Sequence, residues 1–140
     1  MKFLPPFVLI AWVIFGSVPA FAADLRVSLS GFEEKTGSVR VALFASAEDF
    51  AAGRQLAGYF TLVAGDTVEA VFAGLAPGRY GITTFYDQNA NEKLDSNLVG
   101  MPTEPFGFSR NARGRFGPPA FDDFAVELSD EGVSLEILLQ

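Results

Sequence analysis

Most of this chain alternates between apolar and polar residues with a period of two, which is the pattern of half-buried β-strands. Two further runs are rich in aromatic and β-branched residues, and turn-forming residues separate most of the runs. The pattern predicts seven strands, within residues 25–30, 38–43, 59–63, 67–72, 79–86, 124–128 and 133–139. Short strands at this spacing are typical of an antiparallel β-sandwich. We therefore predict one all-β domain, a single antiparallel β-sandwich of about seven strands with an immunoglobulin-like architecture.

Two segments depart from this rhythm. Residues 46–52 predict one short helix, because Ser46 can cap its first turn and Glu48 and Asp49 suit the positive end of its dipole. Residues 87–120 have little strand pattern, yet they contain several phenylalanines and prolines. A loop of this length in a compact domain is usually functional or internally packed, and a disordered linker would hold fewer aromatic residues. We expect an ordered loop that packs back on the sandwich.

The first 22 residues have the three parts of a secretory signal peptide. Lys2 supplies a positive charge, residues 7–15 are apolar, and Ala20, Phe21 and Ala22 form an A-x-A cleavage site. The apolar run is shorter than the roughly 20 residues that span a bilayer. The sequence therefore predicts cleavage near Ala22 and a periplasmic or secreted bacterial domain, 23–140, without an integral membrane segment. An uncleaved anchor is the alternative.

Composition narrows the possible functions. Removing 22 of 140 residues leaves 118, a common size for one domain, and the loss of Lys2 changes the net charge from −7 to −8. This acidity argues against nucleic acid or an anionic membrane surface as a partner. The chain has no cysteine and no histidine, which excludes the usual catalytic triads and the usual zinc, copper and haem ligands. We therefore expect a protein that is not an enzyme.

The long loop opens with oxygen-bearing side chains at alternate positions. Asp87, Asn89, Asn91 and Asp95 occupy positions 1, 3, 5 and 9 of a segment spaced like a calcium-binding loop. Ca²⁺ prefers six to eight hard oxygen ligands, and alternate residues of a tight loop can point inward together. These four residues are the candidate metal ligands. The alternative is a turn in which the same side chains bond to the backbone.

Two positions of this segment differ from such loops. Glu92 stands at position 6, where a glycine normally makes the sharp turn, and Leu98 stands at position 12, where an acidic residue normally closes the shell. A closing ligand would have to be Asn97, Glu104 or water. We therefore expect any calcium affinity to be weak, with a dissociation constant of about 0.1–1 mM.

A basic island follows in the same loop. Arg110, Arg113 and Arg115 lie within the glycine- and phenylalanine-rich run 106–119. Arginine forks bind carboxylates and phosphates well, so these residues are candidates for an anion or acidic-ligand site. The favoured alternative is that they anchor the loop by pairing with the acids at 87, 95, 122 and 123. Phenylalanines at alternating strand positions are expected to belong to the core.

Two resemblances add to this picture. The segment 74–80, Gly-Leu-Ala-Pro-Gly-Arg-Tyr, resembles a turn of transthyretin-like and carboxypeptidase-regulatory-like β-sandwiches, which implies a prealbumin-like form of the sandwich. The transthyretin-like hydrolase of urate breakdown depends on histidines, which this chain lacks. Across nearly all of the predicted mature chain, the motifs at 39–44, 74–80, 87–95, 102–109 and 111–119 resemble a bacterial exported family, Domain of Unknown Function 2141 (DUF2141). That resemblance implies an exported β-sandwich and supplies no activity.

The leading functional hypothesis is a non-catalytic exported module that binds a ligand or Ca²⁺ through residues 87–119. A structural or accessory subunit of an envelope complex is the alternative, and it predicts a contiguous apolar patch on one sheet face or edge. A carboxylate-based hydrolase is a third hypothesis, although the sequence locates no pair of carboxylates for it.

Overall fold

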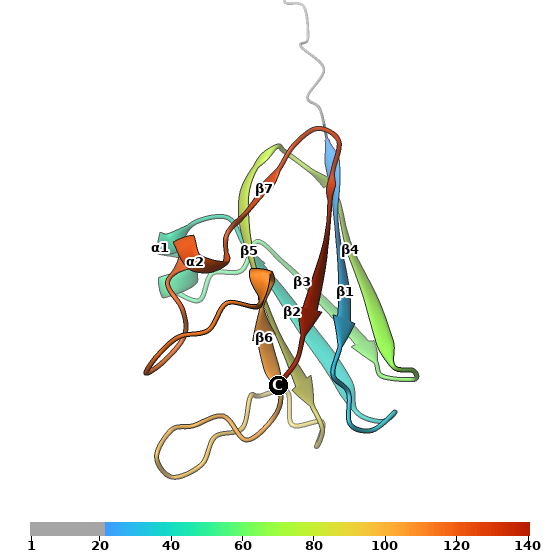
Figure 1. Cartoon of the computed structure of the whole chain (residues 1–140), viewed down its shortest axis with the longest axis vertical. Helices are drawn as coiled ribbons and strands as arrows, with labels where there is room; N and C mark the ends of the chain where they lie inside the picture. The colour runs from blue at the N-terminus through green and yellow to red at the C-terminus, as the bar shows by residue number, and fades with distance from the viewer. Residues whose placement is uncertain (1–21) are drawn as a thin grey trace, which may run out of the picture.

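A computed structural model describes residues 22–140 and shows two β-sheets packed against each other (Figure 1). One sheet has the order β4-β1-β8, formed by Thr67–Leu75, Ala23–Ser30 and Val133–Leu138. The other has the order β3-β2-β5-β6, formed by Ala57–Leu62, Ser38–Phe44, Gly78–Asp87 and Phe106–Phe108, and β7 (Val126–Leu128) also pairs with β5. The predicted all-β sandwich is confirmed.

The strand assignments differ from the predicted ones in three places. β1 and β8, the first and last strands, pair in parallel. The other paired strands are antiparallel, as predicted for the sandwich. β6 is an eighth strand inside the predicted loop 87–120, paired with β5. The predicted strand 124–128 is shorter, because Phe124 ends a helix and its side chain is buried among other aromatic rings.

Three short helical segments pack beside the five-stranded sheet. α1 (Ala47–Ala51) is the predicted helix, and the Asp49 amide donates to the Ser46 hydroxyl at 3.1 Å as its N-cap. A 3₁₀ turn, η1 (Ser109–Asn111), follows β6, and α2 (Phe121–Phe124) precedes β7. Among residues 22–140, no helix has the length and hydropathy of a membrane-spanning segment. The predicted signal peptide falls on residues 1–22, which lie outside the described residues except for Ala22.

The main hydrophobic core lies between the sheets. It is built by the inward positions of the strands, and thirteen of its members lie on β1, β2, β4 and β5: Ala23, Leu25, Val27, Leu29, Val39, Val41, Leu43, Val68, Ala70, Phe72, Tyr80, Ile82 and Tyr86. On β1, β2 and β4 these positions are the apolar members of the predicted alternation. The predicted periodicity therefore identifies the buried face of these three strands.

A second, aromatic cluster lies on the outer face of the five-stranded sheet. α1 and α2 bring Phe50, Phe121 and Phe124 against Phe44 of β2 and Phe108 of β6. Because Gly81 of β5 has no side chain, Phe124 can lie against the sheet, and a Cβ at Gly81 would overlap the Phe124 ring. The cluster covers one end of this face and leaves the other end of the sheet open.

Candidate functional site

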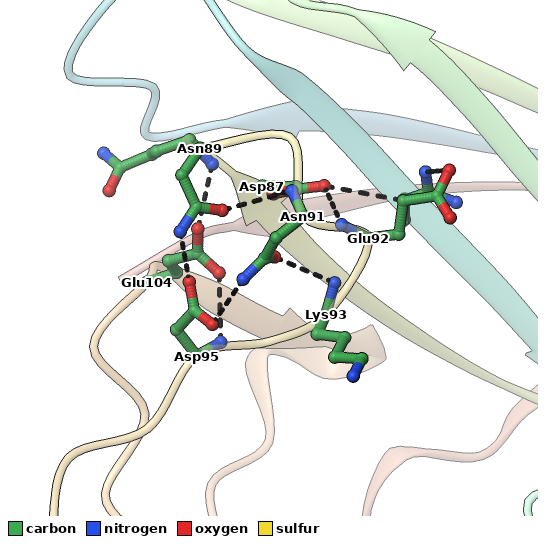
Figure 2. A network of polar contacts seen from close by, with 9 residues as sticks. Asp87, Asn89, Asn91, Glu92, Lys93, Asp95 and Glu104 are labelled. Carbon is green, nitrogen blue, oxygen red and sulfur yellow. Dashed lines mark hydrogen bonds and ion pairs between the residues drawn. The ribbon is translucent and has the colours of Figure 1, made fainter.

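The acidic loop begins at the last residue of β5. The Asp87 carboxylate is fully buried, and its two oxygens accept the backbone N–H groups of Asn91 at 3.1 Å and Glu92 at 2.9 Å (Figure 2). The guanidinium Nε of Arg40, on β2, lies 3.8 Å from Asp87 Oδ2. Asp87 therefore holds the turn closed by satisfying backbone donors and by facing a positive charge.

The other predicted ligands meet at Asp95. The side-chain amides of Asn89 and Asn91 donate to the two oxygens of Asp95 at 2.5 and 2.6 Å, and the Asn91 Oδ1 accepts the Lys93 N–H at 3.0 Å (Figure 2). Three of the four candidates thus converge, but the amides present N–H groups to the carboxylate. Asp87 directs its oxygens to the backbone instead. The residues at 87, 89 and 91 form the side-chain-to-backbone bonds of the alternative turn hypothesis.

Glu104 joins the two ends of this loop. Its carboxylate is 6% exposed and accepts the Gln88 N–H at 3.0 Å and the Asp95 N–H at 3.1 Å (Figure 2). The sequence analysis considered Glu104 only as a possible closing ligand for a cation. Both of its oxygens accept backbone N–H groups of the loop. The sequence signal for this role is weak, because it is a single acidic residue sixteen positions after Gln88. Within residues 22–140, no three acidic side chains are grouped as a metal-holding cluster.

The backbone of the loop is strained at the position where a glycine is usual. Glu92 has φ +67° and Ala90 has φ +56°, in the left-handed region that non-glycine residues adopt at a cost. The Glu92 carboxylate pairs with Arg40 Nη2 at 3.1 Å. A contact between β2 and the loop therefore fixes the side chain that replaces the glycine.

The three arginines of the basic island do not pair with the acids that were expected to anchor them. Among the described residues, no ion pair involves Arg110, Arg113 or Arg115. Asp87 faces Arg40, and Asp122 pairs with Arg79 at 3.0 Å. The segment is held instead by neutral groups. The Leu138 N–H donates to the Asn111 Oδ1 at 2.9 Å, and the buried Ser109 hydroxyl bonds to Ile82 and Phe124.

A groove on the outer face of the five-stranded sheet adjoins the acidic loop. Strand pairing places Gly58, Ala42 and Thr83 in one row across β3, β2 and β5, and all three are small. On the same face of the sheet, the next row toward the acidic loop contains Phe60, Arg40 and Phe85. A row of small residues beside a row of large ones leaves a depression of about 370 Å³, which is also lined by Gln55 and Glu92.

The groove is a site that the sequence analysis missed. The Phe60 side chain has 54% of its surface exposed, and the Arg40 guanidinium carbon lies 4.8 Å from its ring centroid. Arg40 is held on three sides, by Phe60, by Glu92 and by the charge of Asp87. A weak signal was available, because Phe60 occupies the outward position of an alternating strand. Arg40, Phe85 and Glu92, which line the groove with it, come from distant parts of the chain.

The family model described as "Uncharacterized protein conserved in bacteria (DUF2141)" matches residues 27–136, which include most of both sheets, the acidic loop and the groove. No curated protein and no solved structure matches the chain. The matched region covers most of the 140 residues. The chain therefore belongs to the DUF2141 family of bacterial proteins.

Proposed function

We propose that this protein is an exported, non-catalytic module that binds an uncharged sugar ring in the groove of the five-stranded sheet. The observation that carries the proposal is the row of Phe60, Arg40 and Phe85 beside the smaller residues of the groove floor. Small-ligand sites usually combine apolar surface with a few fixed polar groups in a volume of about 300–1,000 Å³. The groove of about 370 Å³ lies at the lower end of that range.

The charges around the groove favour a neutral ligand. The positive charge of Arg40 is opposed by Glu92 at 3.1 Å and by Asp87 at 3.8 Å, so little of it is available to attract an anion. The exposed ring of Phe60 offers a flat apolar surface, while Gln55 and Thr83 offer an amide and a hydroxyl. A sugar ring has an apolar face and a rim of hydroxyls, which matches this combination.

Binding without catalysis fits the same residues. Glycoside hydrolysis needs two carboxylates on either side of the scissile bond. The acidic residue that lines the groove is Glu92, and its carboxylate is paired with Arg40. The full sequence has no histidine or cysteine to supply another general base or nucleophile. The predicted signal peptide would deliver the module to the bacterial envelope or beyond, where polysaccharides are accessible.

Replacing Phe60 with alanine is expected to weaken saccharide binding about tenfold without destabilising the fold, because the ring is exposed and its contribution is mainly to stacking. The measurement is an NMR titration of the purified exported protein with chitotriose and, separately, maltotriose. Leu62→Ala is the matched control, since Leu62 lies two residues along the same strand, is 69% exposed and is outside the groove lining. Absence of binding by the unmodified protein to both probes, or equal binding by Phe60→Ala, contradicts the proposal.

The accessory-subunit alternative is favoured by a different observation. Leu56, Phe60 and Leu62 are all more than half exposed and follow the edge strand β3. An apolar strip at a sheet edge is suited to contact with another protein. Leu62→Ala separates the two functions. Loss of a protein partner with retained saccharide binding supports the accessory role, whereas a change in saccharide binding alone in Phe60→Ala supports the module proposed above.

Calcium binding by the acidic loop is a second function that we propose to test. The support is that Asn89, Asn91 and Asp95 already converge, so turning the two amides would present oxygens in place of N–H groups. If the dissociation constant is about 0.1–1 mM, then ~10 mM Ca²⁺ raises the free energy of unfolding by about 1.4–2.7 kcal/mol. Thermal melting with Ca²⁺, with Mg²⁺ and with chelator measures this.

The calcium test has its own matched variants. Asp95→Ala removes the side chain on which the amides converge and should abolish the Ca²⁺-dependent rise. Asp130→Ala removes an exposed acid from the turn before β8 and should leave it unchanged. An identical melting temperature with Ca²⁺ and with chelator shows that the loop is closed by its own hydrogen bonds.

A further inference from the structure

A short apolar finger, residues 96–102, projects from the long loop. Leu98 and Val99 are 107% and 81% exposed, and Met101 is 61% exposed. The stretch 96–103 contains no charged residue. Single exposed apolar residues are ordinary on protein surfaces, but three within four positions at the end of one loop are a concentrated apolar surface.

The finger is held in one shape by its own hydrogen bonds. Asn97 accepts the Val99 and Met101 N–H groups through its side chain, each at 3.0 Å, and its own N–H donates to the Met101 carbonyl at 2.8 Å. Ser96 and Pro102 form an antiparallel bridge at the base. These bonds keep the apolar side chains from folding back onto the domain, so the tip is preorganised to contact something outside it.

A second exposed apolar residue lies in the basic loop, residues 112–118. Phe116 is 100% exposed, and it follows Arg113 and Arg115, for which the described part of the chain provides no ion-pair partner. In Figure 1 the finger and the basic loop both extend on the side of β6 and α2, away from the sheet β4-β1-β8. Two apolar tips and two unpaired positive charges are therefore presented on one side of the sandwich.

We propose that the apolar finger and the basic loop dock this protein on an anionic membrane surface. Leu98, Val99 and Phe116 would enter the boundary between headgroups and acyl chains, and Arg113 and Arg115 would contact the anionic headgroups. The charge-free finger loses no ionic hydration on entry, and the arginines match the lipid charge. The net charge of the chain argued against such a surface, but attraction near a membrane depends on the charges within about a Debye length of it. This docking is independent of the saccharide groove.

Vesicle sedimentation with the purified exported protein tests the proposal. We expect the protein to pellet with vesicles of phosphatidylcholine containing about one-third phosphatidylglycerol, and to bind vesicles of phosphatidylcholine alone at least about fivefold more weakly. The double variant Leu98→Ser/Val99→Ser should bind the anionic vesicles at least about tenfold more weakly than the unmodified protein. Both side chains are exposed, so their apolar contacts would form only on the membrane. Arg113→Gln/Arg115→Gln should remove the preference for anionic lipid and its sensitivity to salt.

Leu62→Ser is the matched control, because it removes an exposed apolar residue from strand β3 instead of the finger. It should bind vesicles as the unmodified protein does, and a melting curve for each variant verifies folding. The proposal is overturned if the unmodified protein fails to bind anionic vesicles, if the finger variant binds equally well, or if Leu62→Ser loses binding to the same extent. Finger-dependent crosslinking to an envelope protein without vesicle binding also overturns it, in favour of a protein partner.

Discussion

Replacing Asp87 with alanine is expected to lower the free energy of unfolding by about 3 kcal/mol, which is a fall in melting temperature of about 10 °C for a domain of this size. The carboxylate is fully buried and accepts the N–H groups of Asn91 and Glu92. Its removal leaves those donors without an acceptor and removes the negative charge nearest to the Nε of Arg40. Urea unfolding and calorimetry measure the loss.

Asp95→Ala is the matched control for this prediction, since it removes the same side chain from the same loop. Asp95 is partly exposed and its carboxylate accepts only two exposed side-chain amides, so its loss should cost about 1 kcal/mol or less. Asp87→Asn retains the shape and one acceptor oxygen and should fall between the two. Equal losses for Asp87→Ala and Asp95→Ala would show that the buried carboxylate does not organise the loop.

The fold was largely predictable because one physical rule governs most of it. Residues such as Val39, Val41 and Leu43 alternate with polar or small residues, and burying one face of a strand requires this period. The parallel pairing of β1 with β8 was not predictable from periodicity, since the period is the same for either direction. β6 was missed because a strand of three residues is too short to show alternation.

The groove was beyond sequence reasoning for a different reason. Gly58, Ala42 and Thr83 are unremarkable where they stand in the chain, and only the pairing register of three strands places them in one row. A shift of one residue in either pairing would turn these side chains to the other face of the sheet. The same register places Arg40 between Phe60 and Phe85. The groove therefore depends on the pairing register of β3, β2 and β5.

The acidic loop was predictable in its spacing but not in its partners. Alternate polar residues indicated a tight turn with side chains that bond inward, and such a turn is present. Which side chain accepts from which donor depends on Glu104 and Arg40, which lie outside the motif in sequence. The arginines show the same limit. Sequence proximity of opposite charges favoured internal pairing, but Arg40 and Arg79 occupy that role at Asp87 and Asp122.

Replacing Phe124 with alanine is expected to have the largest effect on stability, a loss of about 3–5 kcal/mol. The Phe124 side chain is fully buried, and its ring centroid lies 4.9 Å from that of Phe50 and 5.1 Å from that of Phe108. The vacated space lies against Gly81, which has no side chain to fill it. Because Ala42 of the groove floor also packs against this cluster, the variant should weaken saccharide binding as well as stability.

Phe116→Ala is the matched control, because it makes the identical change eight positions earlier, at a ring that is 100% exposed. We expect it to leave the free energy of unfolding within about 0.5 kcal/mol of the unmodified protein. Denaturant unfolding of both variants, with the slope compared as well as the midpoint, makes the measurement. A loss below about 1 kcal/mol for Phe124→Ala would contradict the prediction, because it would mean that packing in the aromatic cluster contributes little to the stability of the sheet. It would also mean that the strands alone position Ala42 at the end of the groove.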